Sequence, residues 1–505
     1  MNKIKNFFKN NYLYIIFCVL FIIINTVLFR KAELNNNLRL VIYFVSIIVE
    51  LSYIFIINKL KISIEKMFLV IAIPLGLLFM ILLPIGQIPD ENTHYERIYA
   101  ISEGYLISKS DSEGTGYAYM PDYVLNNFNN GNIENFEYSN VTDNLFKKYD
   151  KKIVKKTFPN TSLYSFVVYI PQTVGVLVGK ILHLPQLLTV YLARLFNFIV
   201  YVLLIYYSIK LIPFLKKAVM LIALLPISLQ EGISLAPDAL TISLSLLLVS
   251  YILHLRYSNS SKLNNKHFVV LIVLSTICSL CKIVYIPIVL LSLLIPNDKF
   301  KSKRDKYFKV LFILLICIVL NIGWTLFASR YLTALNPGVN SKEQVRFILS
   351  HPFEYIKIIF NTYKDSYIGL IYQAFGISLG VFSVYTYKIY PILSGIILLI
   401  ICIFNRFKNI LLNKKEKIIY LLISFSIIIL ITTSLYVQWT PLKNSVVNGI
   451  QGRYFIPILI FAPLIMMNDK NKKNLNIDEK MNRYYYSFIV FQLVNAVTMI
   501  VLHYM

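Results

Sequence analysis

Uninterrupted apolar runs of roughly 18 to 20 residues recur along the chain, and they limit its fold more than any other feature. A helix of that length crosses the hydrocarbon core of a bilayer, and it satisfies its own backbone hydrogen bonds where no water is available. The composition agrees, because 57% of the 505 residues are hydrophobic and 15% are charged, whereas soluble domains carry about a quarter charged residues. The sequence therefore predicts an all-α, polytopic integral membrane protein.

The net charge of +25 is distributed in a way that argues against a nucleic-acid partner. Lysines and arginines gather in short links between apolar runs, which is the positive-inside pattern of cytoplasmic loops, and they indicate contact with anionic lipid. These links lie at 59–61, 216–217, 299–309, 414–417 and 470–473. Lys3, Lys5 and Lys9 place the N-terminus in the cytoplasm. Richness in Ile, Asn and Lys suggests a bacterial source, so we expect a multi-pass protein of the bacterial plasma membrane.

The apolar runs also predict a topology. Spans near 12–29, 38–57 and 67–85 deliver the polar region 86–162 to the outer side as a large external loop with amphipathic helices. Its length exceeds that of ordinary connections, which favours a folded subdomain. We interpret 163–183 as re-entrant or interfacial, because counting it as a span would place the later basic links outside. Further spans, for about thirteen in all, are expected near 187–209, 218–234, 237–255, 267–281, 283–296, 308–328, 387–405, 417–437, 454–468 and 484–503.

Three parts follow from this topology. Residues 1–66 hold two additional N-terminal transmembrane helices, 67–470 form the membrane core, and 471–505 hold a cytoplasmic link and the last helix, which ends outside. The core includes a second external region at 329–386, polar at first and then Gly-rich and apolar. The five cysteines lie in apolar segments, so no disulfide framework is expected.

The polar stretch after the third span holds the strongest candidates for chemistry. Asp90 and Glu91 are adjacent carboxylates, followed by His94 and Arg97, at the point where hydrocarbon meets water. Charge at such a depth is costly and usually functional. Two carboxylates there suit either of two roles, as ligands of a divalent cation or as a base that takes a proton from a hydroxyl group. The alternative is that a membrane helix simply ends in a solvated polar turn.

Three later stretches reach the same face of the membrane in this topology. They are the turn 226–239 with Gln230 and Asp238, the short hairpin that turns at Lys282 and continues to Tyr285, and 451–457 with Gln451 and Arg453. Carboxylates, cations and amides that converge on one side of a membrane indicate an external active site. Simpler roles stay open. Asp238 suits the N-cap of a helix, Glu231 a wet bundle interior, and Lys282 and Arg453 contact with headgroups.

Together the four stretches resemble the DUF2142 family of bacterial membrane proteins. The pattern is Pro-Asp-Glu-x-x-His-Tyr-x-Arg at 89–97, Leu-Pro-x-Ser-x-Gln with Ser-x-x-Pro-Asp-Ala-Leu at 225–240, Lys282 with Tyr285 and Pro287, and Gln-Gly-Arg-Tyr-Phe-x-Pro at 451–457. The likeness runs from about residue 67 to 470. The family in turn looks like a branch of the GT-C glycosyltransferases, which implies a GT-C-like fold with its large external loop after the third span.

The resemblance implies an inverting membrane glycosyltransferase. In GT-C enzymes a carboxylate of the first large external loop is a base or a metal ligand, so Asp90 and Glu91 are expected to be catalytic. The donor would be a sugar on a polyprenyl phosphate, and the acceptor an extracytoplasmic glycan or lipid at the cell surface. The implied substrate-binding residues are His94, Arg97, Gln230, Asp238, Lys282, Tyr285, Gln451 and Arg453, with the donor phosphate on Lys282 and Arg453. The implied cofactor is a divalent cation, Mg²⁺ or Mn²⁺, on Asp90, Glu91 and Asp238, although the adjacent Asp-Glu differs from the separated Asp-x-Asp of some relatives.

Three other classes compete with this interpretation, and one of them, a purely structural membrane scaffold, leaves Asp90 and Asp238 unexplained. A transporter or flippase of lipid-linked saccharides would show internal repeats and polar residues on both sides of a mid-membrane site, and neither pattern is visible. A polymerase of lipid-linked saccharides would be favoured by an arginine-rich loop, whereas 86–162 is rich in lysine.

Overall fold

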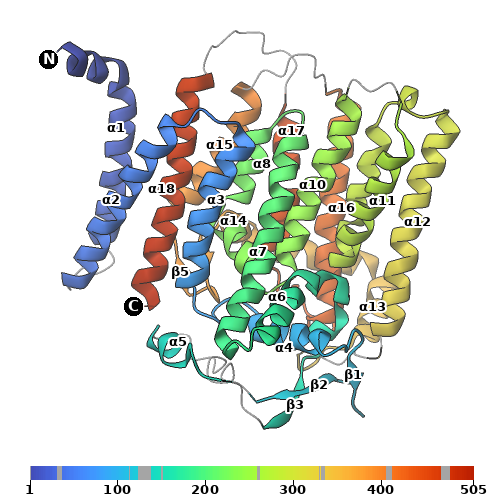
Figure 1. Cartoon of the computed structure of the whole chain (residues 1–505). Coiled ribbons are helices and arrows are strands. Elements are labelled where there is room, and N and C mark those ends of the chain that lie inside the picture. Colours follow the sequence, from blue (N-terminus) through green and yellow to red (C-terminus); the bar gives the residue numbers. More distant parts are fainter. Residues whose placement is uncertain are drawn as a thin grey trace.

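The computed structural model describes residues 2–30, 37–112, 114–122, 138–148, 152–258, 262–328, 330, 336–404, 412–467 and 478–504. The fold is mostly helical, and its long helices run side by side (Figure 1). Of the predicted cytoplasmic link after 470, residues 471–477 lie outside the described residues, as does the basic cluster 470–473.

Seven helices in the described part of the chain are long and apolar enough to cross a membrane. They are α2 (Asn37–Lys59), α3 (Ile64–Leu82), α7 (Gln186–Leu211), α10 (Asp238–Tyr257), α12 (Lys303–Ala328), α16 (Lys414–Gln438) and α18 (Asp478–Tyr504). Shorter apolar helical segments are found in α1 (Asn2–Arg30), α11 (Asn265–Cys281) and α15 (Ile389–Phe404). The protein is therefore a polytopic membrane protein, and the seven long helices agree with seven of the expected spans.

Three of the expected spans are not single α-helices, and each of them contains a proline. The run 218–234 is divided into α8 (Lys216–Ala223) and α9 (Pro226–Ile233), because Pro226 has no N–H to continue the first helix and instead begins the second. The run 283–296 forms the 3₁₀ helix η5 (Ile283–Leu294), which contains Pro287. The run 454–468 forms the 3₁₀ helix η8 (Gly452–Ile458), with Pro457 inside, and the short α17 (Phe461–Met466).

The first polar region contains short strands, so the protein is mostly helical and not all-α as expected. After α4 (Glu91–Ser102), the segments β1 (Lys109–Ser110), β2 (Gly116–Pro121) and β3 (Ile153–Thr157) pair as an antiparallel sheet with β2 in the centre. Burial alternates along β2, as expected of a strand with one covered face. The helix α5 (Ser139–Asn144) belongs to the same region. The sheet lies at one end of the helix bundle, below α4 and α6 in Figure 1.

The segment after this region forms η3 (Thr161–Leu163), η4 (Phe166–Tyr169) and α6 (Ile170–Ile181). With 12 residues, α6 is about 18 Å long, too short to cross a hydrocarbon core of about 30 Å. It packs tightly on α7, since a Cβ at Gly175 would lie 2.6 Å from the Leu192 carbonyl oxygen. This short helix lies at the sheet end of the bundle (Figure 1).

The second polar region, 329–386, contains two helices and a hairpin. The 3₁₀ turn η6 (Asn297–Lys299) precedes α12, and α13 (Ser341–Ser350) and α14 (Pro352–Ala374) follow it. After α14 the strands β4 (Ser378–Leu379) and β5 (Val384–Tyr385) pair as a hairpin.

A buried polar network attaches α1 and α2 to the rest of the bundle. Asn25 of α1 donates to Glu50 of α2 at 3.2 Å and accepts from the Tyr390 hydroxyl of α15 at 2.7 Å. Thr498 of α18 and Ser46 of α2 form a further hydrogen bond of 2.8 Å. In a low-dielectric interior such bonds hold helices in register.

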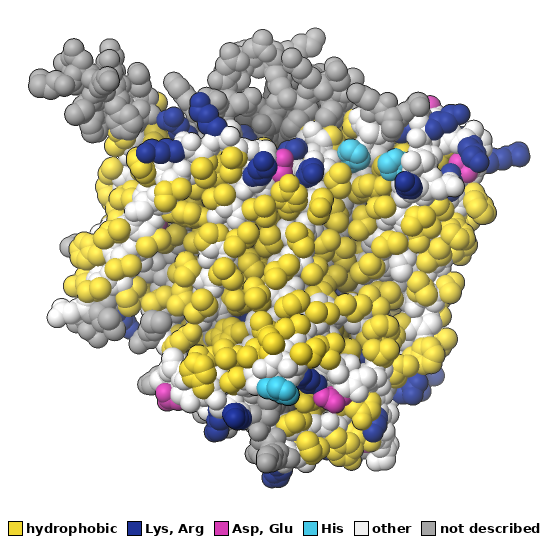
Figure 2. Space-filling view, in the orientation of Figure 1, with side chains coloured by type: hydrophobic (Ala, Val, Ile, Leu, Met, Phe, Trp, Pro, Cys, Tyr) yellow, Lys and Arg dark blue, Asp and Glu magenta, His cyan; other side chains and the backbone are white. Residues whose placement is uncertain are grey.

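Side chains on the surface follow the membrane pattern. Hydrophobic side chains cover the middle of the molecule, and Lys and Arg side chains gather toward its two ends (Figure 2). The N-terminus lies at the end opposite the sheet, and the C-terminus lies at the sheet end (Figure 1). At the centre, nearly all side chains of α10 are buried, so this helix forms the core of the bundle.

Candidate functional site

Asp90 stands at the start of α4 in a backbone conformation that few residues adopt. Its φ is 61°, in the left-handed region, where aspartate is tolerated better than most residues. Although Asp90 occupies the N-cap position, its side chain makes no capping hydrogen bond. The carboxylate is instead 49% exposed and faces a cavity. Strained backbone with a side chain withheld from capping is typical of a functional position.

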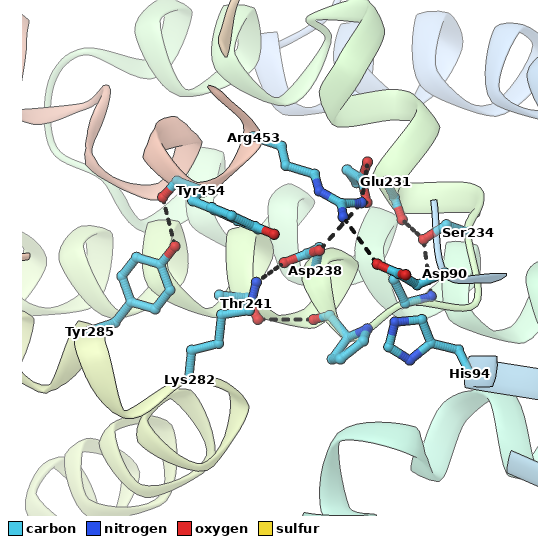
Figure 3. A network of polar contacts seen from close by, with 12 residues as sticks. Asp90, His94, Glu231, Ser234, Asp238, Thr241, Lys282, Tyr285, Arg453 and Tyr454 are labelled. Atoms are coloured by element: carbon cyan, nitrogen blue, oxygen red, sulfur yellow. Dashed lines mark hydrogen bonds and ion pairs between the residues drawn. The ribbon is translucent and has the colours of Figure 1, made fainter. Parts of the chain in front are cut away.

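Arg453 lies at the centre of a buried charge cluster drawn from four separate segments (Figure 3). Its guanidinium nitrogens lie 3.7 Å from an Asp90 oxygen, 3.4 Å from Glu231 and 3.8 Å from Asp238. Charge-assisted hydrogen bonds are usually about 2.7–2.9 Å long, so Arg453 holds three carboxylates loosely. The arrangement excludes the simpler role of a side chain that extends to lipid headgroups, because Arg453 is buried.

Lys282 and Asp238 form the tightest pair of the cluster. The Lys282 Nζ donates to Asp238 Oδ1 at 2.6 Å, and the ammonium lies 4.5 Å from the centre of the Tyr454 ring. Asp238 is the first residue of α10, and the positive end of the helix dipole favours its negative charge. Pro237, and not Asp238, occupies the N-cap position of α10, so the N-cap role does not explain Asp238.

The backbone around Arg453 is fixed by close packing. Gly452 donates its N–H to the Gln373 side chain at 2.9 Å, and a Cβ at Gly452 would lie 2.4 Å from the Ala374 nitrogen. Only glycine allows η8 to approach α14 this closely. Tyr285 donates its hydroxyl to the Tyr454 carbonyl oxygen at 2.7 Å, which attaches η5 to the same turn.

His94 lies beside the cluster, one helical turn after Asp90. Its Nδ1 is 2.8 Å from the Tyr169 hydroxyl. Burial lowers the pKa of His94 to about 4, against the opposing effect of the nearby Asp90 carboxylate. The imidazole is therefore neutral at pH 7, and the cluster beside it combines the three carboxyl groups of Asp90, Glu231 and Asp238 with the two cations Lys282 and Arg453.

Glu91 and Arg97 take up other positions. The Glu91 carboxylate is buried against Arg194 of α7, at 2.7 Å and 2.6 Å, and also accepts the Gly86 N–H at 2.8 Å. Arg97 donates to the Tyr105 and Leu106 carbonyl oxygens at 2.9 Å and 2.6 Å, which holds the turn after α4. Glu91 thus stabilises the loop before Asp90 and Arg97 the turn after α4, and neither side chain lines the cavity.

The two predicted glutamines differ in their surroundings. The Gln230 Oε1 accepts the Gly380 N–H at 2.7 Å, so Gln230 holds the β4–β5 hairpin against the cluster. Gln451 lines the cavity, and its Oε1 is buried without a hydrogen-bonding partner among the described residues.

The cavity beside the cluster has a volume of about 520 Å³, within the range of small-molecule sites. Among the described residues that line it, the acidic and basic ones are Asp90, His94 and Lys282. Its wall also includes both tryptophans of the chain, Trp324 and Trp439.

The expected ligand set for a divalent cation is not brought together. Glu91 faces Arg194, while Asp90 and Asp238 both contact Arg453. No group of three or more Asp, Glu, His or Cys side chains suited to a metal ion occurs within the described residues. The residues therefore do not fit the predicted cation, and Arg453 and Lys282 supply the positive charge at this position.

A comparison with known protein families assigns the chain to one of them. A family described as "Predicted membrane protein (DUF2142)" matches residues 74–462. The chain belongs to the DUF2142 family. No curated protein and no solved structure matches this DUF2142 protein.

Sequence reasoning missed two partners in this DUF2142 protein. Glu231, expected only to face a wet interior, contacts Arg453 and is fully buried. Arg194 lies inside a predicted span, where an arginine without a carboxylate partner would be costly. Because of that cost, the sequence alone could have indicated that Arg194 has an acidic partner. In the structure this partner is Glu91.

Proposed function

We propose that this protein is an inverting membrane glycosyltransferase that moves a sugar from a polyprenyl phosphate to a glycan or lipid acceptor outside the plasma membrane. The observation that carries the proposal is the half-exposed Asp90 carboxylate on the wall of a cavity that also contains the Lys282 ammonium. A base and a cation that share one cavity match the two charges that develop when a hydroxyl group displaces a phosphate.

Asp90 is the catalytic base in this mechanism. The acceptor hydroxyl binds next to the Asp90 carboxylate, which removes its proton as the oxygen attacks the anomeric carbon. A bond forms between the acceptor oxygen and that carbon, while the bond from the carbon to the phosphate oxygen breaks on the opposite face. The proton ends on Asp90 and the electron pair on the leaving polyprenyl phosphate. Inversion follows from in-line displacement.

Lys282 stabilises the leaving phosphate. One of its three donors is engaged by Asp238, which leaves two for phosphate oxygens in the cavity. Arg453 supports the site from behind, since its guanidinium lies 3.7 Å from Asp90 and 3.8 Å from Asp238 and it does not belong to the described lining. The sequence predicted that Lys282 and Arg453 both bind the phosphate. In this mechanism Lys282 contacts the phosphate and Arg453 supports the site.

The proposal is tested with membranes that contain the full-length protein and a panel of radiolabelled polyprenyl-phosphate hexoses. Wild-type protein should transfer label to endogenous glycan or lipid. Lys282→Ala should raise the apparent KM for the donor by at least tenfold, and an unchanged KM would remove Lys282 from phosphate binding. If the intact donor moves between leaflets and no new glycosidic bond forms, the protein is a flippase and the transferase proposal is wrong.

A further inference from the structure

The cavity beside the charged cluster has aromatic side chains in its wall, as a sugar-binding surface does. Trp324 of α12, Trp439 after α16, Tyr164 and Tyr285 contribute to its wall. The C–H groups on one face of a sugar ring carry slight positive charge, and they are attracted to the negative face of an aromatic ring. The chain has two tryptophans in 505 residues, and both are here.

Both indole rings are held in position. The Trp324 Nε1 donates to the Leu163 carbonyl oxygen at 2.8 Å, and its ring lies edge-on to Phe166. Trp439 is packed against Gly449, where an added Cβ would lie 2.6 Å from the indole Cδ1. Rings that are fixed before binding lose little entropy when a ligand stacks on them.

Gln451 supplies an independent sign of a missing ligand. Gln451 is one of the residues that line the cavity, and its buried Oε1 has no hydrogen-bond donor among the described residues. A buried acceptor without a partner costs about 1–3 kcal/mol, so native proteins usually satisfy it. A hydroxyl group of a bound molecule would donate the missing hydrogen bond.

Charge on the wall distinguishes between classes of sugar. Asp90, His94 and Lys282 are the acidic and basic residues of the described lining, and all three belong to the charged cluster or lie beside it. Apart from the Cys281 thiol, the rest of the described lining is aromatic, aliphatic or carries amide and hydroxyl groups. A sugar carboxylate placed there would be desolvated without a counter-ion, which is costly.

We propose that Trp324, Trp439 and Gln451 form a binding compartment for an uncharged hexose ring, in which Gln451 accepts a hydrogen bond from a sugar hydroxyl. This inference rests on the proposed function and names the class of sugar. The phosphate of the same donor occupies the Lys282 end of the cavity.

Tryptophan fluorescence of the full-length protein in lipid nanodiscs tests the compartment. The probes are a short-chain prenyl phosphate, the same lipid carrying glucose, and the same lipid carrying glucuronate. The glucose compound should shift the emission and bind at least tenfold more tightly than either of the others. Equal affinity for the sugar-free lipid, or for the glucuronate compound, would overturn the proposal.

Variants assign the effect to residues. Gln451→Leu should weaken binding of the glucose compound about tenfold, and Trp439→Phe should remove much of the emission change. Gln492→Leu removes a buried amide of α18, outside the cavity, and should bind like wild type. An unchanged affinity in Gln451→Leu would exclude the hydrogen bond.

The two proposals fail in different ways. Glucose-specific binding with no transfer in the radiolabel assay would support the binding compartment and contradict the transferase proposal. Transfer activity together with equal binding of the glucose compound and the sugar-free lipid would support the transferase proposal and contradict the binding compartment.

Discussion

The Glu91 carboxylate and the Arg194 guanidinium are joined by two hydrogen bonds, 2.7 Å and 2.6 Å long, across 103 residues of sequence. Arg194 also donates to the carbonyl oxygens of Met80, Leu83 and Pro84. These carbonyls lie at the end of α3, so one buried arginine joins α7, the end of α3 and the start of α4. The pair fixes the loop from which Asp90 extends.

Breaking this pair should destabilise the protein. Arg194→Leu leaves the Glu91 carboxylate buried without a counter-ion, and the expected loss is about 3–5 kcal/mol. The double variant Glu91→Leu/Arg194→Leu should recover part of the loss, because it leaves no uncompensated charge. The thermal midpoint in detergent measures both. A single variant as stable as wild type would contradict the structural role of the pair.

Asp90→Asn should reduce sugar transfer by about 10²–10⁴-fold, the usual contribution of a general base, because an amide cannot accept the proton. The thermal midpoint should stay close to that of wild type, since the Asp90 contact with Arg453 is long and partly exposed. Asp143→Asn changes an exposed carboxylate in the same polar region and is the matched control. Full activity in Asp90→Asn would exclude it as the base.

Gly452→Ala should lower stability by about 1–3 kcal/mol and displace Arg453, because the added Cβ would meet backbone atoms of α14 that cannot move aside. We expect at least a tenfold loss of transfer. Gly323→Ala in α12 is the control, since its Cβ would meet no atom within 4 Å and alanine is the better helix former. Equal behaviour of the two variants would contradict close packing at Gly452.

Acid should destabilise the protein through His94. Burial lowers the pKa of His94 from 6.5 to about 4, so between these values the unfolded chain binds a proton that the folded chain does not. Stability therefore falls as the pH drops from 6.5 toward 4, by up to roughly 3 kcal/mol. His94→Phe should remove this dependence from the thermal midpoint.

Glu96, two residues after His94 on α4, should change the pH dependence of stability in the opposite direction. Burial raises the pKa of its carboxyl from 4.5 to about 7, so its contribution is present below pH 4.5 and is lost as the pH rises through 7. Glu96→Gln should remove the loss on the alkaline side and keep the loss in acid. If both variants titrate like wild type, neither group is buried as described.

A cysteine at Ser112, between β1 and β2, should react with a membrane-impermeant maleimide added to intact cells. Ser302→Cys, within the basic link 299–309, should react only after the membrane is opened. The described native cysteines Cys18, Cys278, Cys281 and Cys317 are buried and should contribute little background. The reverse labelling pattern would place the cavity on the cytoplasmic side.

The sequence by itself determined that the chain lies in a membrane as a bundle of helices, because an apolar run in lipid can satisfy its backbone only by forming a helix. It also indicated which polar stretches to examine, since the cost of charge near hydrocarbon marks 89–97 and 451–457 without any structure. It did not predict the sheet 109–157, whose short strands are rich in lysine and tyrosine and carry little hydrophobic signal.

Only the tertiary structure decided which carboxylate faces the cavity. Asp90 and Glu91 are adjacent and chemically alike, but successive side chains at a helix start point in different directions, and each meets a different part of the fold. Glu91 meets Arg194 of α7, whereas Asp90 meets Arg453 of η8 and open space. That difference arises from contacts more than 100 residues apart, which local sequence does not encode.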